Sequence, residues 1–242
     1  MTGRLRGALA AMSAGPSWPA DSGDRATVDV LGLRLPVRAT VAIAVVTMVL
    51  LLDYSRTFLP ADVVDLGRAP AAMLATSVER AILFGIVPLL TVLVAFRDRP
   101  VRYGLTLGDW RWGLGLMLAG CAVMTPIVLW FATLPDVRAY YGPSAAPLPE
   151  LVLTNVLDLA AAEFAFRGFL LMTLLRIMGP VGVVVAALPF VFGHLGKPEL
   201  ELLSTLAGGL VYGWLAWRTR SIVWGAVGHT YILTLVTVAA AR

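Results

Sequence analysis

Five side chains that ionise or carry an imidazole lie inside apolar stretches of the sequence, where such groups are rare. Asp158, Glu163 and Arg167 share one stretch, His194 closes a later one and His229 lies within the last. Ionisable residues in membrane-length apolar segments are expensive, usually face the protein interior and mark functional sites. Glu163 precedes Arg167 by four residues, which makes the two neighbours on a helix in the order that favours an ion pair. These five residues form the candidate site.

Imidazoles that face a carboxylate in a desolvated cavity are suited to one kind of chemistry. They polarise water and donate hydrogen bonds to a developing oxyanion. Gly193 and Gly228 precede the two histidines and would let a neighbouring helix or a substrate backbone come close. The alternative for Glu163 and Arg167 is a structural ion pair that locks one helix against another, and for a single histidine it is packing. Histidines on two further segments favour hydrolysis over both alternatives.

Two histidines and one glutamate also resemble the ligand set of a catalytic zinc site. The sequence contains no His-Glu-x-x-His helix, and the ligands would have to come from three separate segments. Cys121 is the single cysteine, so neither an intrachain disulfide nor a cysteine metal cluster can form. We therefore expect no cofactor, with zinc as the alternative that chelators and metal analysis would test.

The composition is that of a polytopic membrane protein. Of the 242 residues 59% are hydrophobic and 14% charged, and the mean hydropathy is +0.83, values outside the range of soluble domains. The net charge of +4 and the pI near 9.6 reflect basic residues between apolar runs, so they indicate membrane topology rather than a nucleic-acid partner. The expected partners are the lipid bilayer and a membrane-associated protein or peptide substrate.

Seven apolar runs meet or approach the roughly 17 to 25 residues that cross a bilayer. They cover residues 40–53, 81–96, 112–134, 151–175, 181–195, 200–217 and 222–240. We predict an all-α polytopic bundle of about seven transmembrane helices. Most Lys and Arg residues of the connecting segments fall on the side of the N-terminus, which favours a cytoplasmic N-terminus. Nearly all basic residues are arginine, which is typical of a GC-rich bacterial genome and hence of a bacterial plasma membrane protein.

Three stretches together resemble a known family. "AEFAFRGFL", "FVFGH" and "SIVWGAVGHTYIL" resemble the motifs of the CAAX protease and bacteriocin-processing (CPBP, or Abi) family of intramembrane glutamic proteases. The family pattern is Glu-Glu-x-x-x-Arg, Phe-x-x-x-His and His-x-x-x-Asn on three helices. By position, Glu163 and Arg167 match the second glutamate and the arginine, Phe190 and His194 match the second motif, and His229 matches the third histidine. The resemblance implies a CPBP-like helical core over residues 146–242. The apolar runs predict N-terminal transmembrane helices over residues 37–145, and the Gly-, Pro-, Ser- and Asp-containing composition of residues 1–36 favours a cytoplasmic tail or interfacial segment.

The sequence departs from the family pattern at two positions. Ala162 replaces the first glutamate, which in the family activates the water, and Leu233 replaces the asparagine. Three explanations stay open: an engineered inactive variant, a pseudoprotease that binds without cutting, or a base moved to Glu163 or to Asp158, one helical turn before Ala162. An ion pair with Arg167 would make Glu163 a weaker base, whereas Asp158 has no partner that the sequence reveals.

The resemblance implies an intramembrane endopeptidase in which a glutamate activates water. Glu163, His194 and His229 are the expected catalytic residues, with Arg167, Phe190, Asp158 and the Ala162 position in support. Bacteriocin precursors or C-terminal sorting tails are expected as substrates ahead of prenylated CAAX termini. A transporter or membrane scaffold is the second function class, but no repeat relates the two halves of the sequence.

Overall fold

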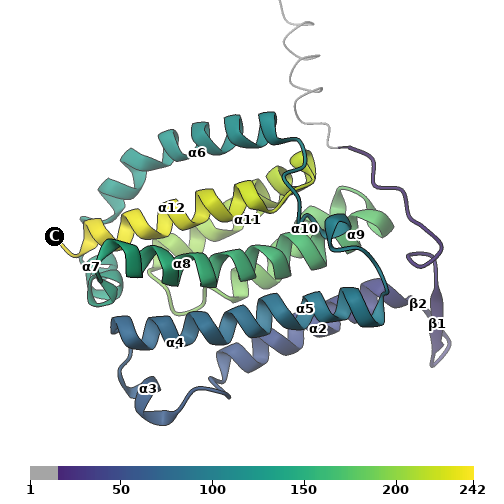
Figure 1. Ribbon diagram of the computed structural model, residues 1–242, viewed down its shortest axis with the longest axis horizontal. Coiled ribbons are helices and arrows are strands. Elements are labelled where there is room, and N and C mark those ends of the chain that lie inside the picture. Colours follow the sequence, from purple (N-terminus) through teal and green to yellow (C-terminus); the bar gives the residue numbers. More distant parts are fainter. Residues whose placement is uncertain (1–15) are drawn as a thin grey trace, which may run out of the picture.

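Seven helical segments run back and forth along one axis in the computed structural model, which describes residues 16–242 (Figure 1). Each coincides with one of the predicted apolar runs, and the prediction of an all-α membrane bundle is confirmed. The segments, in chain order, are α2 (Val37–Tyr54), α4 to η2, α6 (Trp110–Phe131), α8 to α9, α10 (Val181–Phe192), α11 (Glu199–Thr219) and α12 (Val223–Ala240).

Two of the segments change their helical winding along their length. The second comprises α4 (Pro70–Arg80), η1 (Ala81–Ile86), α5 (Val87–Leu90) and η2 (Thr91–Ala95), and the fourth comprises α8 (Leu148–Glu163), η5 (Phe164–Leu170) and α9 (Leu171–Met178). The stretches η1, η2 and η5 are π-helical. Such widened turns are uncommon and occur often at functional sites. The longest of them, η5, directly follows Glu163 and contains Arg167.

By length and composition, four helical segments of the described residues are able to cross a membrane. They are α2, residues 70–95, α6 and α12. The helix α10 is apolar but has 12 residues, and at about 1.5 Å per residue it rises about 18 Å, less than the roughly 30 Å of a hydrocarbon core. The loop that follows α10 and carries His194 therefore begins within the thickness of the bundle.

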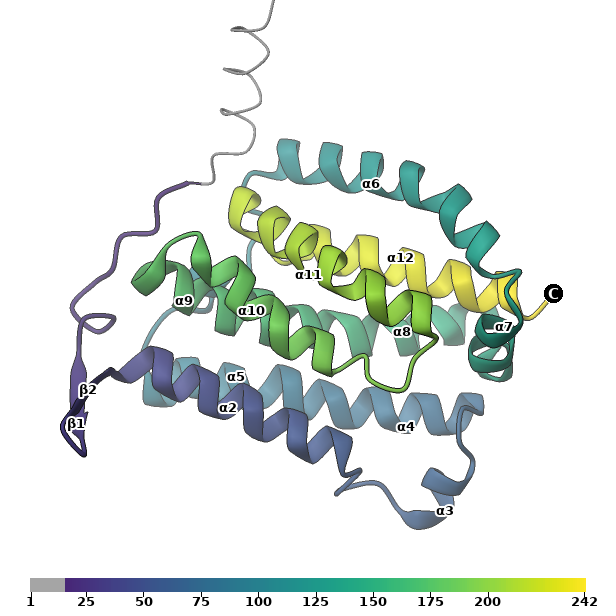
Figure 2. The same cartoon turned by 180° about the vertical axis from the view of Figure 1, so that it is seen from behind.

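The two ends of the bundle differ in their short elements, as both views show (Figures 1 and 2). The hairpin end carries the antiparallel strands β1 (Thr27–Val30) and β2 (Leu33–Pro36), together with η3 (Pro100–Tyr103) and the connection between α9 and α10. The α7 end carries α3 (Ala61–Asp65), α7 (Pro135–Tyr141), η4 (Gly142–Ser144) and the C-terminus.

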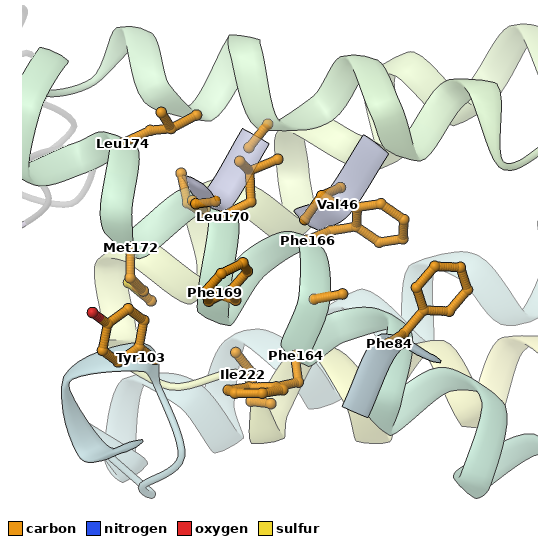
Figure 3. Packing of buried hydrophobic residues seen from close by; sticks show 14 of the residues in the cluster. Val46, Phe84, Tyr103, Phe164, Phe166, Phe169, Leu170, Met172, Leu174 and Ile222 are labelled. Atoms are coloured by element: carbon orange, nitrogen blue, oxygen red, sulfur yellow. The ribbon is translucent and has the colours of Figure 1, made fainter. Parts of the chain in front are cut away.

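The main apolar core surrounds η5 (Figure 3). Phe169 is fully buried and stacks on Phe96 with ring centroids 5.8 Å apart, and Phe84 lies 5.7 Å from Phe166. Gly168 is required here, because a Cβ at this position would lie 2.6 Å from the carbonyl oxygen of Tyr103. Close packing on several sides fixes the helix that carries the candidate site.

An ion cluster joins the N-terminal segment to the hairpin end of the bundle. Residues 1–15 of the predicted tail lie outside the described residues, whereas the rest of that segment packs against the bundle through two aspartates before forming the exposed hairpin. Arg176 lies 3.1 Å from Asp24, and both side chains are fully buried. The cluster, which we call the N-terminal ion cluster, consists of Asp21, Asp24, Asp98, Arg38, Arg102 and Arg176.

The N-terminal ion cluster should resist mild acid. Burial raises the pKa of Asp21 and Asp98, but hydrogen bonds from backbone amides and from Arg102, with the neighbouring arginine charges, outweigh burial and hold both pKa values below the ordinary 3.8. A lowered pKa in the folded state stabilises above the unfolded pKa, and the contribution is lost as the pH falls through the folded pKa. We expect hydrogen exchange of residues 16–36, corrected for intrinsic rates, to stay constant from neutral pH to about pH 4 and to rise below it.

Two variants give that experiment its control. Asp21→Asn should increase exchange of the segment already at neutral pH, whereas Asp29→Asn, on the exposed strand β1 outside the cluster, should not. Exchange that increased between pH 7 and 5 in the unaltered protein would show that these carboxylates do not hold the segment.

Candidate active site

A carboxylate and an imidazole from two helices meet at the centre of the bundle. Glu163, the last residue of α8, is fully buried, and its Oε1 lies 3.0 Å from Nδ1 of His229 on α12. The same oxygen lies 3.1 Å from Nη1 of Arg167, so the ion pair expected from the four-residue spacing is present. Asn155 on α8 donates a hydrogen bond to Thr234 on α12 at 3.0 Å, which joins the two helices elsewhere along their contact.

Space for the buried carboxylate comes from a glycine. A Cβ on Gly225 would lie 3.1 Å from Oε2 of Glu163, so a larger residue at this point of α12 would press on the carboxylate. Among the described residues, Oε2 of Glu163 and both terminal nitrogens of Arg167 are buried without a hydrogen-bond partner. Buried polar groups of this kind call for an explanation and are a recognised feature of catalytic sites.

His194, the second histidine, is connected to the other site residues by the ring of Phe190. The ring of Phe190 lies 4.4 Å from that of His194 and 5.9 Å from that of His229, and the guanidinium of Arg167 lies 3.7 Å from its centroid. Nδ1 of His194 lies 2.8 Å from the carbonyl oxygen of Phe190. Tyr212 on α11 stacks on His229 at 5.1 Å. One aromatic ring thus contacts both imidazoles and the arginine.

These groups border a largely apolar cavity of about 470 Å³. His194, His229 and Tyr212 line it, and it extends to Tyr141 and Lys197 towards the α7 end of the bundle. Glu163 is not part of the cavity wall. It is hydrogen-bonded to His229, which is. A mostly apolar cavity with a few convergent polar groups is typical of a binding site.

Both departures from the family motifs face this cavity. Ala162 lines it beside Glu163, and Leu233 lies on its wall one helical turn after His229. At each position an apolar side chain lies on the cavity wall where the family motif has a polar one. The imidazoles and the hydrogen-bonded carboxylate behind them remain.

Asp158 is not the unpaired carboxyl that the sequence suggests. Nη1 of Arg80 lies 3.1 Å from its Oδ2, and the same guanidinium donates to both carboxylate oxygens of Asp53 on α2 at 2.7 and 3.0 Å. Arg80 directly precedes the predicted apolar run of residues 81–96, a position typical of a connecting segment, but in the structure it lies where α4, α2 and α8 meet. All three residues line the cavity.

Two further cavity residues, Tyr212 and Glu201, could not be recognised as site residues from the sequence. Tyr212 reads as an apolar helix residue, and Glu201 reads as part of a solvated helix start. In the structure, Glu201 accepts a hydrogen bond from the hydroxyl of Tyr141 and lies 2.9 Å from Nζ of Lys197. The signal for Glu201 in the sequence is a charged group near a run boundary, which loop residues share, and Tyr212 inside its run gives no signal.

Within residues 16–242 no group of three His, Cys, Asp or Glu side chains is arranged to hold a metal ion. Nδ1 of each histidine already faces an oxygen acceptor of the protein, the Phe190 carbonyl or the Glu163 carboxylate. A metal-free site stays a prediction that metal analysis of purified protein tests.

Comparison with known proteins identifies the region that carries the site. A family model described as type II CAAX prenyl endopeptidase Rce1-like matches residues 144–234, a stretch that includes Glu163, Arg167, His194 and His229. No curated protein and no solved structure matches the chain significantly. Residues 144–234 are therefore similar to the Rce1-like CAAX proteases, and the resemblance of this region to the CAAX protease and bacteriocin-processing family is confirmed.

Proposed function

We propose that the protein is an intramembrane endopeptidase that hydrolyses a peptide bond of a membrane-associated protein or of a C-terminal sorting segment. The observation that carries the proposal is the hydrogen bond of 3.0 Å between Glu163 and His229 at the wall of a cavity that His194 also lines. Hydrolysis requires a proton acceptor for water and a donor for the oxyanion. Two imidazoles and one buried carboxylate supply both.

The cavity fits a peptide with apolar side chains. Its walls carry Phe84, Met124, Phe131 and Phe166, while polar groups concentrate at the histidines and towards the α7 end. An apolar segment that leaves the bilayer would bury these side chains and present its carbonyl to the imidazoles. The polar α7 end would admit water, which peptide hydrolysis consumes.

Purified protein in liposomes tests the proposal with a panel of quenched fluorogenic peptides that end in apolar tails. Cleavage at one bond, located by the mass of the products, supports it. His194→Gln should reduce the rate by about 10² or more, whereas Tyr231→Phe, a variant of a partly exposed tyrosine on α12, should not. A cleavage rate of the His194→Gln variant equal to that of the unaltered protein would show that His194 is not part of the catalytic site.

Binding without cleavage is the second candidate function. The observation that favours it is that Ala162 and Leu233 both line the cavity, where the family has a glutamate and an asparagine. A pseudoprotease would keep the cavity and hold a peptide there. Tight binding of a panel peptide without products would support this function.

We further propose that the N-terminus is cytoplasmic in a bacterial plasma membrane, so that the cavity opens to the outside. Arginines concentrate at the hairpin end, whereas the cavity extends towards the α7 end, and cytoplasmic ends carry the excess of basic residues. The arginines at the hairpin end are Arg25, Arg34, Arg38, Arg97, Arg99, Arg102, Arg111, Arg176, Arg218 and Arg220.

Cysteine labelling tests this orientation. In a Cys121→Ser background, a membrane-impermeant maleimide should label Asp136→Cys on α7 in intact cells, and should label Arg99→Cys at the hairpin end only after lysis. Both positions are exposed. The reverse pattern would place the cavity on the cytoplasmic side.

A further inference from the structure

The cavity wall contains few groups that can take a proton from water. Ala162 and Leu233 cannot do so, and Glu163 is fully buried behind the wall with Oε1 shared between Arg167 and His229. Resting on the proposed function, we propose that His229 is the general base of this chain and that Glu163 is a positioning residue that acts through it.

The hydrogen bond between the two residues defines which nitrogen of His229 is free. An ionised carboxylate only accepts hydrogen bonds, so Nδ1 of His229 carries the proton and donates it to Oε1 of Glu163 over 3.0 Å. In a neutral imidazole the other nitrogen, Nε2, then carries a lone pair. Arg167, 3.1 Å from the same oxygen, favours the ionised carboxylate that this arrangement needs.

Two aromatic rings hold the imidazole in this orientation. Tyr212 lies parallel to His229, with ring centroids 5.1 Å apart and planes inclined by 23°, and Phe190 meets it edge-on at 5.9 Å and 71°. Tilting the ring plane would break both ring contacts, and a half-turn of the ring within that plane would break the hydrogen bond to Glu163. The free nitrogen is therefore held in one direction, as a base oriented by a third group requires.

The other candidates for the base are placed less well. His194 also has Nδ1 directed at an oxygen, but this oxygen is the uncharged carbonyl of Phe190, and the cation Lys197 follows three residues later. An imidazolium at His194 would therefore lack the carboxylate that stabilises one at His229. Asp158 is bound to Arg80 at 3.1 Å. Only His229, among the described cavity residues, combines a free nitrogen with a buried carboxylate behind it.

The reaction that follows is balanced without a cofactor. Nε2 of His229 takes a proton from water while the water oxygen bonds to the carbonyl carbon and the carbonyl electron pair moves to its oxygen. When the tetrahedral intermediate collapses, the bond from carbon to nitrogen breaks, and the proton on Nε2 passes to the leaving amine nitrogen. The products are a carboxylic acid and an amine, and His229 returns to its starting form.

Nitrogen NMR of the histidines tests the positioning directly, since the chain has only two of them. In liposomes containing protein with ¹⁵N-labelled histidine, His194→Gln assigns the two imidazoles. We expect His229 at neutral pH to have a protonated Nδ1 and an unprotonated Nε2. Glu163→Gln should shift part of the His229 population to the form protonated at Nε2, because the amide, unlike the carboxylate, can also donate to Nδ1, whereas Glu150→Gln in the exposed first turn of the same helix should change nothing.

A doubly protonated His229, or one protonated at Nε2 in the unaltered protein, would overturn the assignment. The activity of the same samples on the fluorogenic panel separates this failure from that of the proposed function. The expected spectrum together with a loss of about 10² or more in kcat for Glu163→Gln supports both. The expected spectrum without cleavage by the unaltered protein supports the positioning of His229 and overturns the endopeptidase proposal.

Discussion

Replacing Arg80 with methionine is expected to destabilise the bundle by about 3 to 5 kcal/mol, the cost of leaving buried charges without their partner. Arg80 is the cation that two buried carboxylates share, Asp53 at 2.7 Å and Asp158 at 3.1 Å. Its loss leaves two negative charges facing each other between three helices. Unfolding of the detergent-solubilised protein by denaturant or by heat measures this change in the free energy of unfolding.

Neutralising the carboxylates supplies the matched control. The triple variant Asp53→Asn, Arg80→Met and Asp158→Asn carries no buried charge at this point, and we expect it to recover most of the lost stability. Arg56→Met, which removes one hydrogen bond to Thr76 near the same end, should cost far less. Equal stability of Arg80→Met and the unaltered protein would show that the three residues do not form a buried network.

Ala162→Glu is expected to increase kcat/KM by about 10 to 100-fold, part of the range that a positioned proton acceptor contributes. Ala162 lies on the cavity wall next to Glu163, so a carboxylate there would enter the space that His194 and His229 line. The steady-state rate on the best peptide of the fluorogenic panel measures the effect. Ala162→Gln is the control, because it has the same length but accepts no proton, and we expect no gain from it.

The outcomes of that experiment separate the explanations for Ala162. Cleavage by both forms, faster with the glutamate, supports a working enzyme whose own residues supply the base. Cleavage by the Ala162→Glu form alone would show that the chain is an inactive relative with an intact scaffold. Equal rates in both forms would show that the reacting bond does not reach position 162.

Contacts within one helix, and positions in a family motif, could be predicted from the sequence. The four-residue spacing of Glu163 and Arg167 defines their proximity because the helix repeat is local. The bundle itself followed from apolar run lengths. His194 and His229 are different, since no local rule joins residues on separate helices, and it was the order of the three motifs that pointed to a shared site.

Contacts between distant segments could not be predicted in this way. Arg80 meets Asp53 and Asp158 across 27 and 78 positions of sequence, and a run-boundary arginine has no mark that distinguishes it from a loop arginine. The contact between Asp24 and Arg176, which lie 152 positions apart, could not be predicted for the same reason. The role of Tyr212 depends on the angle between α11 and α12, which the apolar pattern of either helix does not specify.

A double-mutant cycle on Glu163 and His229 tests the central claim most directly. Residues that act as one unit lose their contribution together, so either single change should remove nearly as much as both. With kcat/KM measured on one fluorogenic peptide in liposomes, we expect Glu163→Gln, His229→Gln and the double variant each to fall by about 10² or more and to lie close together. Losses that multiply in the double variant, or a single variant that keeps its activity, would contradict the account.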